Sequence, residues 1–257
     1  MKIAICGKGG SGKSTIAALL AREYARRSRA VLVVDTDESN LGLHRLLGVD
    51  APLDLMGYFG GKRAMTEKIM AAMPALSSLD LVGETWTIDD LPPGHVAQRD
   101  GVRLVAIGKI HDADEGCACP MGMLARQFLE HLDTGGDGVV IADTEAGIEH
   151  FGRGVDQGAD AILMIVDPSF ESLRLAEKVR DMAARIGVPL YYILNRIDLF
   201  SAARLRKGLP DSSRIVCEIP QDPAILAAGL DGRALDMRHP EIAALADVLD
   251  GILGVRS

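Results

Sequence analysis

The stretch GKGGSGKST, residues 7–15, decides the fold of this chain. It fits the phosphate-loop pattern G-x-x-x-x-G-K-[ST] and carries an additional lysine, Lys8, directly after the first glycine. An apolar run at residues 2–6 precedes it. Apolar residues follow it at helical spacing, namely Ile16, Leu19, Leu20 and Tyr24. The order strand, glycine loop, helix is the one that a phosphate loop requires.

The residue types of this loop explain how it would bind a nucleotide. Glycines let successive backbone N–H groups point at phosphate oxygens, and the N-terminus of the following helix adds partial positive charge. Lys13 can reach the terminal phosphates, and the Ser14 hydroxyl can bind Mg²⁺. We therefore expect a nucleotide site that includes Gly9, Gly10, Ser11, Gly12, Lys13, Ser14 and Thr15.

Length and composition favour a globular enzyme. The chain has 257 residues, 48% of them hydrophobic, without a Pro- or Ser-rich linker, so one α/β domain over residues 1–257 is expected. Its formal net charge of −8 opposes general binding to nucleic acid. No run of eighteen uncharged apolar residues suggests a membrane segment, so we expect a cytoplasmic protein without a membrane or nucleic-acid partner.

Apolar runs alternate with helical patterns along most of the chain. A strong helical stripe covers residues 170–186, whereas residues 49–100 show no readable period. This alternation predicts an α/β fold with a single doubly wound, mostly parallel sheet flanked by helices. Besides residues 2–6, the expected strands are 31–34, 102–107, 139–142, 161–166, 190–194 and 215–217.

Acidic residues follow two of these strands, where ligands bind in such sheets. In DTDESN, Asp35 and Asp37 can orient a water and the Mg²⁺ shell. In DTEAG, Asp143 can serve as the acidic residue beside the metal, with Gly147 as the pivot of a switch. An aspartate after a strand is also a common helix cap or turn residue.

A third strand end carries Asn195 and Arg196, in the sequence NRID. The asparagine carboxamide offers a donor and an acceptor that complement an adenine edge, so we expect the base here. NRID also approximates the N-K-x-D pattern with which GTPases recognise guanine. This strand alone does not separate ATP from GTP.

Lys8 together with Lys13 resembles the deviant Walker A loop of the family of MinD, ParA and the nitrogenase iron protein. The resemblance implies an ATPase that forms a nucleotide-dependent homodimer. It also implies that Lys8 reaches the partner's phosphates, that Asp37 positions the attacking water and that Asp35 lies on the metal side. On this basis Lys8, Lys13 and Asp37 are the candidate catalytic residues.

The four cysteines fall into two classes. Cys6 and Cys217 lie in apolar strand runs, where buried thiols are expected. Cys117 and Cys119 form C-x-C in a polar segment before a helix expected to begin near Met121. In a cytosolic protein such a pair is a metal or redox candidate rather than a structural disulfide. Two thiolates are half a tetrahedral site. Further ligands would come from His111, Asp114 or Glu115, or from a second copy that supplies two more thiolates.

Longer stretches carry a closer resemblance. GCACPMGMLARQFL (116–129), DTEAGIEHFGRG (143–154) and DTDESNLGLHRLLG (35–48) resemble the CooC-type accessory ATPases of carbon monoxide dehydrogenase. This resemblance implies that Cys117 and Cys119 bind Ni²⁺ or Zn²⁺ at the dimer interface and that nickel is delivered to carbon monoxide dehydrogenase as client. Acetyl-CoA synthase is another nickel enzyme of the client class. Glu38 departs from the proline that many relatives have after the switch aspartate.

Three other functions fit parts of the sequence. An iron–sulfur electron-transfer ATPase needs a cysteine soon after the Asp143 motif, which has none. A nickel-delivering GTPase would use NRID, although Lys8 counts against it. A positioning ATPase on a membrane wants a basic tail, whereas the apolar stripe at residues 242–253 is flanked by acids and is expected to pack on the body. The arginines near residues 22–29 are expected to be solvated, and His111 and His150 to be solvated or transient nickel ligands.

Overall fold

The computed structural model describes residues 1–73, 79–110 and 119–254. An eight-stranded sheet with the order β10-β9-β8-β1-β7-β2-β5-β4 forms its centre, and every pairing is parallel except the antiparallel β4–β5 pair. The strands are β1 (Lys2–Gly7), β2 (Val31–Asp35), β4 (Ala97–Arg99), β5 (Val102–Ala106), β7 (Val139–Asp143), β8 (Ala161–Val166), β9 (Leu190–Ile197) and β10 (Ile215–Pro220). The predicted α/β architecture is confirmed.

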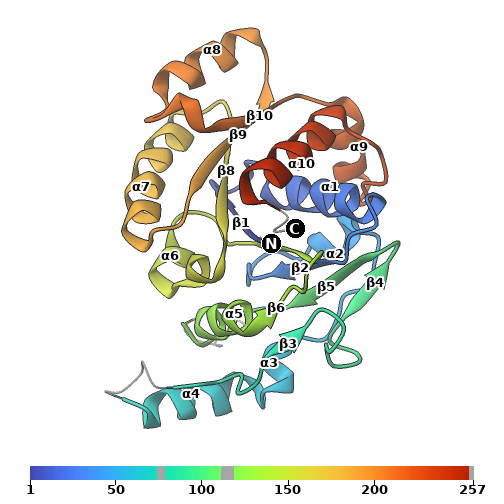
Figure 1. The fold of residues 1–257 in the computed structure, drawn as a ribbon, viewed down its shortest axis with the longest axis vertical. Helices are drawn as coiled ribbons and strands as arrows, with labels where there is room; N and C mark the ends of the chain where they lie inside the picture. The colour runs from blue at the N-terminus through green and yellow to red at the C-terminus, as the bar shows by residue number, and fades with distance from the viewer. Residues whose placement is uncertain (74–78, 111–118, 255–257) are drawn as a thin grey trace.

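Helices cover both faces of the sheet (Figure 1). Helices α1 and α10 lie on one side, with α9, and α5, α6 and α7 lie on the other. The helices are α1 (Lys13–Arg26), α2 (Leu43–Leu46), α3 (Leu55–Tyr58), α4 (Gly61–Ala71), α5 (Cys119–His131), α6 (Glu149–Arg153), α7 (Phe170–Ile186), α8 (Leu199–Gly208), α9 (Pro223–Leu230) and α10 (Pro240–Leu253). Short 3-10 turns occupy η2 (Val155–Gly158) and η3 (Ser212–Arg214).

Alternate residues of the strands enter different cores. Ile3 and Ile5 of β1 pack in a core with α1 and α10, whereas Ala4 and Cys6 pack in another core with α7. Burial of both faces explains why the strands are continuous apolar runs. A third core, between α5 and the segment before β5, contains Trp86, whose ring meets that of Phe128 edge-on at 5.9 Å.

Most predicted elements are present, with different ends. The predicted helix 170–186 is α7, and the buried thiols of Cys6 and Cys217 are confirmed. Helix α5 begins at Cys119 rather than near Met121. The unreadable stretch 49–100 contains α3, α4, β4 and the two-residue strand β3 (Trp86–Thr87), which pairs with β6 (Leu132–Asp133). No helix of the described residues is both long enough and apolar enough to cross a membrane.

Of the arginines near the end of α1, Arg26 is exposed as the sequence suggested, whereas Arg22 is buried and Arg27 and Arg29 are half-buried. Arg22 is 4% exposed, pairs with Asp100 and Asp236 at 3.0 Å each, and donates to the Leu47 carbonyl at 2.6 Å. Its neighbours reach α10. Arg27 pairs with Asp247 at 2.7 Å and Asp250 at 3.4 Å. The acidic side of α10 therefore faces these arginines, while its apolar stripe packs on α1 and β10 as expected.

Candidate nucleotide site

The phosphate loop joins β1 to α1 and needs glycine at two positions. Gly7 has φ +145°, and a Cβ there would lie 2.6 Å from the Ile165 carbonyl oxygen. Gly12 has φ +104°, and a Cβ there would lie 2.3 Å from Nδ2 of Asn195. No side chain of the described residues caps the N-terminus of α1. Its first backbone N–H groups are thus available to an anion, as the sequence predicted for the phosphates.

The two lysines of the loop have different surroundings. Lys13 is 7% exposed, and its Nζ lies 3.5 Å from the Lys8 carbonyl oxygen. Lys8 extends to the end of β8, where its Nζ pairs with Asp167 Oδ2 at 2.9 Å. Burial alone would raise the pKa of Asp167, but hydrogen bonds from Ser172, Lys8 and Ser169 hold it below its usual value. Within one chain, Lys8 is therefore held by a well-ionised carboxylate.

Ser14 and Asp143, predicted to bind Mg²⁺, are in direct contact. The Ser14 hydroxyl donates to Asp143 Oδ2 at 2.6 Å, and Asn40 Nδ2 donates to the Ser14 oxygen at 2.7 Å. The other carboxylate oxygen of Asp143 is buried without a hydrogen-bond partner among the described residues. Burial raises the pKa of Asp143 to about 6. A hydroxyl beside an unsatisfied carboxylate oxygen fits the oxygen ligands of Mg²⁺.

Asp35, the third residue predicted on the metal side, is neutralised by a lysine. Strand register places Asp35 opposite Asp143, and Lys109 Nζ pairs with Asp35 Oδ2 at 2.7 Å and donates to the Asp37 carbonyl at 2.6 Å. Burial raises the pKa of Asp35 to about 7 although Lys109 opposes this shift. Asp37 is 8% exposed, and its Oδ1 accepts from the backbone and side chain of Ser39.

Asn40 and Lys109 are two polar residues near strand ends that were not predicted as site residues. Both follow the carboxyl end of a strand, Asn40 after β2 and Lys109 after β5. The rule that singled out Asp35 and Asp143 would have included them had it been applied to every polar residue near a strand end.

A cavity of about 290 Å³ lies where the base was expected. It is bounded by Thr15 and Ile16 of α1, by Asn195 and Arg196, and by the segment from Pro220 into α9. Asn195 Nδ2 donates to the Ser11 carbonyl at 2.7 Å, and Arg196 donates to the Gly10 carbonyl at 2.8 Å. Both side chains thus hold the phosphate loop. Gln221 is a further polar group of the cavity that was not predicted from the sequence.

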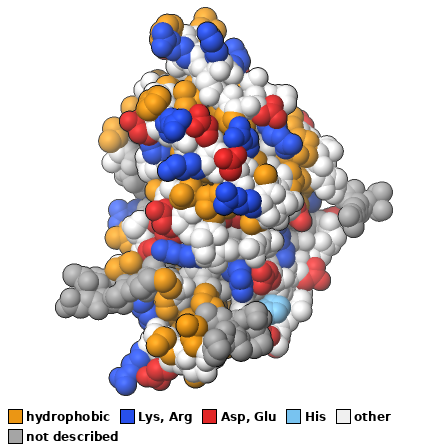
Figure 2. Space-filling view, turned by 90° about the vertical axis from the view of Figure 1, so that its left-hand side faces the viewer, with side chains coloured by type: hydrophobic (Ala, Val, Ile, Leu, Met, Phe, Trp, Pro, Cys, Tyr) orange, Lys and Arg blue, Asp and Glu red, His pale blue; other side chains and the backbone are white. Residues whose placement is uncertain are grey.

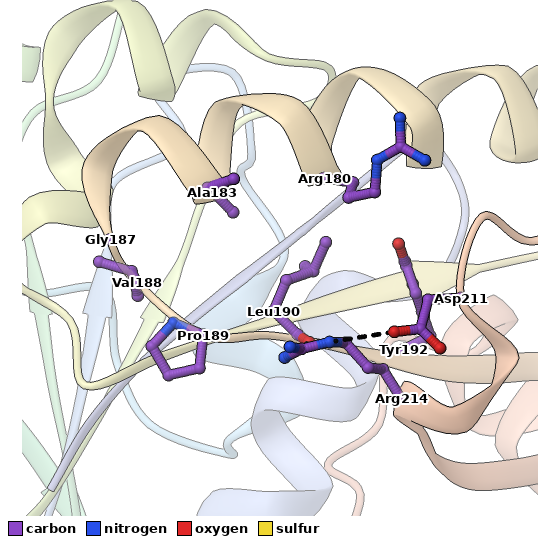
Figure 3. Close-up of a pocket in the computed structure, with 10 residues that line it drawn as sticks. Arg180, Ala183, Gly187, Val188, Pro189, Leu190, Tyr192, Asp211 and Arg214 are labelled. Atoms are coloured by element: carbon purple, nitrogen blue, oxygen red, sulfur yellow. Dashed lines mark hydrogen bonds and ion pairs between the residues drawn. The ribbon is translucent and has the colours of Figure 1, made fainter.

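A second cavity, of about 390 Å³, lies between α7 and the start of β9 (Figure 3). Leu190 and Tyr192 line it, and the ion pair between Arg214 and Asp211 borders it. Because Asn195 is near the other end of β9, this cavity is separate from the nucleotide site.

The C-x-C pair is only partly within the described residues. Cys119 starts α5 and is disulfide-bonded, whereas Cys117 lies outside the described residues together with His111, Asp114 and Glu115. Residues 1–73, 79–110 and 119–254 contain no group of three or more His, Cys, Asp or Glu side chains placed to hold a metal ion.

His150 is neither a solvated residue nor open to a metal. It is 1% exposed, and its Nε2 lies 3.6 Å from Oδ1 of the equally buried Asp156. Burial lowers the pKa of His150 to about 3 and raises that of Asp156 to about 7. The expectation of a surface histidine was wrong because the helix α6 carries this side chain inward.

Comparisons with known proteins identify the family of this chain. Residues 2–235 match the family model of the CobQ/CobB/MinD/ParA nucleotide binding domain. An uncharacterized ATP-binding protein of Methanocaldococcus jannaschii is 44% identical over 97% of this chain and 99% of its own length. The carbon monoxide dehydrogenase accessory protein CooC of Rhodospirillum rubrum is 30% identical over 99% of this chain and 100% of its own.

Solved structures show the same fold. The septum site-determining protein MinD of Pyrococcus horikoshii, complexed with Mg-ADP, has a TM-score of 0.69 at 18% identity, covering 100% of this chain and 98% of that one. MinD of Aquifex aeolicus has a TM-score of 0.65 at 21% identity, covering 97% of this chain and 96% of that one.

Proposed function

The chain belongs to the CobQ/CobB/MinD/ParA nucleotide-binding family, and on that premise we propose that it is a dimeric ATPase that assists nickel insertion into carbon monoxide dehydrogenase. The whole of residues 1–257 acts as one domain in this proposal. The observation that carries it is the combination of the Lys8-containing phosphate loop with full-length similarity to a carbon monoxide dehydrogenase accessory protein. The C-x-C pair supplies the metal-binding step.

ATP hydrolysis follows from the roles of the loop and its neighbours. Gly9–Thr15 and Lys13 hold the phosphates, while Asn195 and Arg196 border the base. Ser14 and Asp143 would hold Mg²⁺, which would offset the negative charge of the phosphates. Asp37 positions the attacking water. Lys8 leaves Asp167 and reaches the partner's phosphates, where its charge stabilises the transition state.

Exposed apolar side chains support the proposed homodimer. Four of them follow strands β2, β8 and β9 in the chain: Leu41, Phe170, Leu199 and Phe200, between 66% and 94% exposed. Apolar side chains left in water at one edge of a fold are typical of a contact surface. The side shown in Figure 2 also exposes apolar groups, interspersed with charges of both signs.

Metal binding is proposed for the reduced form of Cys117 and Cys119. Thiolates are the ligands of Ni²⁺ and Zn²⁺, so the disulfide of Cys119 must be opened before metal binds. Two protomers related by a two-fold axis would present four thiolates. The client is carbon monoxide dehydrogenase, with acetyl-CoA synthase as the alternative nickel enzyme.

An anaerobic Ni²⁺ titration under reducing conditions tests this function. Light scattering follows the molar mass, and hence dimer formation, during the titration. The proteins are the wild type and Cys117→Ala/Cys119→Ala, each with and without Mg-ATP. The matched control is Cys217→Ala, which removes a buried thiol away from C-x-C. We expect one Ni²⁺ per dimer in the wild type and the control, and none in the double variant. Equal binding by all three proteins would refute the C-x-C site.

A further inference from the structure

Arg153, the last residue of α6, joins two acidic residues from different loops. Its Nη1 lies 3.3 Å from Glu38 Oε1 and 2.9 Å from Glu145 Oε1. Both glutamate side chains are 12% exposed and Arg153 is 21% exposed, so water screens these contacts only in part. One guanidinium therefore holds two partly buried carboxylates.

Both carboxylates stand next to residues of the nucleotide site. Glu38 follows Asp37 directly, and Glu145 lies two residues after Asp143. The loop that carries Glu38 is also bonded to the segment after β5, because the backbone N–H of Ile110 donates to the Glu38 carbonyl at 3.1 Å. A structural change at the bound phosphates would therefore displace Glu38 and Glu145 before more distant groups.

The aliphatic part of Arg153 lies against the start of α5. A Cβ added to Gly122, in the first turn of that helix, would lie 2.3 Å from Arg153 Cδ and 2.7 Å from its Cβ. The Arg153 side chain can approach the backbone of α5 this closely only because residue 122 is glycine. The same arginine thus touches the loops after β2 and β7 with its charged end and the backbone of α5 with its stem.

We infer that Arg153 is a positioning residue that couples the nucleotide site to the first turn of α5, where Cys119 begins the helix. Nucleotide binding moves Glu38 and Glu145, Arg153 follows its two carboxylates, and the helix in contact with its stem shifts. Coupling of this kind is reciprocal, so a ligand held near the start of α5 changes nucleotide affinity by the same factor. This inference rests on the proposed function for the identity of that second ligand.

Hydrogen exchange of α5 tests the coupling without any metal. The probe is the non-hydrolysable analogue AMP-PNP with Mg²⁺, added to the wild type, to Arg153→Met and to Gly122→Ala, which disturbs the stem contact without changing charge. Arg206→Met is the matched control, because it removes an exposed arginine of α8 that pairs with Glu218, and α8 lies far from α5 (Figure 1). Circular dichroism melts check that each variant is folded.

We expect nucleotide to change exchange of the α5 amides by about fivefold or more in the wild type and in Arg206→Met. In Arg153→Met this response disappears while AMP-PNP still binds, and Arg153→Lys restores only part of it because an ammonium does not hold two carboxylates in a fixed plane. A wild-type response in Arg153→Met, or an α5 that ignores nucleotide in the wild type, would overturn the inference.

The outcome is independent of nickel. If α5 responds through Arg153 but the Ni²⁺ titration finds no thiolate site, the coupling stands and metal delivery fails. If nickel binds at C-x-C and Arg153→Met leaves the α5 response intact, metal delivery stands and the inference fails. Where both hold, Ni²⁺ should alter the Kd for AMP-PNP in the wild type and lose that effect in Arg153→Met.

Discussion

Two arginine–carboxylate groups of this protein use the same chemistry in different settings. Arg153 holds Glu38 and Glu145, which are 12% exposed and belong to loops beside the phosphate loop. Arg22 and Arg27 join α1 to its surroundings through aspartates that are mostly exposed. The first group connects the segments that carry Asp37 and Asp143, whereas the second joins α1 to α10 and to the segments around it. The contrast predicts activity effects at the strand ends and stability effects around α1.

The largest effect is expected for Lys8→Ala, in the phosphate loop. In the proposed dimer Lys8 supplies its charge to the partner's phosphates, and its loss should lower kcat for ATP by about 1000-fold, the scale found for an arginine finger. Nucleotide affinity and melting temperature should change little, because Lys8 is 32% exposed and its partner Asp167 keeps two serine donors. Steady-state ATPase rates and nucleotide titrations measure both. An unchanged kcat would remove the argument for hydrolysis in trans.

Arg22→Met tests the arginine–carboxylate contacts around α1. It should lower the free energy of unfolding by about 3 kcal/mol, because the substitution removes a buried guanidinium together with its ion pairs and leaves the Leu47 carbonyl without a donor. Urea denaturation measures this change. The ATPase rate per folded molecule should stay at the wild-type value, and a loss of kcat at full stability would show that the two regions are not distinct.

The His150–Asp156 pair extends the comparison to a buried carboxylate without an arginine. Burial raises the pKa of Asp156 to about 7 in the folded state, above its ordinary value, so the folded state holds this proton more tightly than the unfolded chain. The ionisation cost is absent below the ordinary value, grows as pH rises towards 7 and is complete above it.

Asp156→Asn removes that cost, since the amide stays neutral. The variant should match the wild type in stability near pH 4 and exceed it by about 2 kcal/mol near pH 8. Asp160→Asn, at a nearby exposed position, is the control. His150 remains neutral throughout this range because its pKa is lowered to about 3. Denaturant unfolding curves at both pH values measure the difference in stability. If wild type and Asp156→Asn showed the same dependence of stability on pH, the prediction would be wrong.

The smallest effect is expected for Arg27→Met. The Arg27 side chain is 26% exposed, against 5% for Arg22, and Asp247, at 2.7 Å, is 72% exposed. Solvent and salt therefore screen these contacts, and the loss should stay below about 1 kcal/mol. The loss should shrink further in high salt. A loss as large as that of Arg22→Met would mean that burial of the arginine does not set the strength of these contacts.

The sequence predicted the apolar bodies of the strands better than their ends. Runs such as 161–166 match β8 because burial on both faces demands uninterrupted apolar residues. Asp35, Asp143 and Asn195 were expected just after their strands, yet each lies within one, since ladder hydrogen bonds continue through polar residues. Strand β4 was missed because its three residues, AQR, form an edge with little apolar character.

Contacts distant in sequence could not be predicted from any pattern. Nothing in the sequence marks Lys109 as the partner of Asp35, because the pairing depends on β2 and β5 being neighbours in the sheet. The same holds for Arg22, which lies in a run of arginines that local pattern assigns to solvent, and for His150, which a polar motif places on the surface. In each case tertiary packing determines whether the side chain is buried and which group it contacts.

The two borders of the sheet limit how copies of this chain can meet. Strand β4 is only three residues long, and β10 has register irregularities and ends at Pro220, which has no N–H to donate. Neither border offers the long, regular row of free backbone groups that strand addition needs. Self-association by continuation of the sheet into an open-ended ribbon is thereby disfavoured. Contact through side chains, which closes after two copies, is left as the easier route.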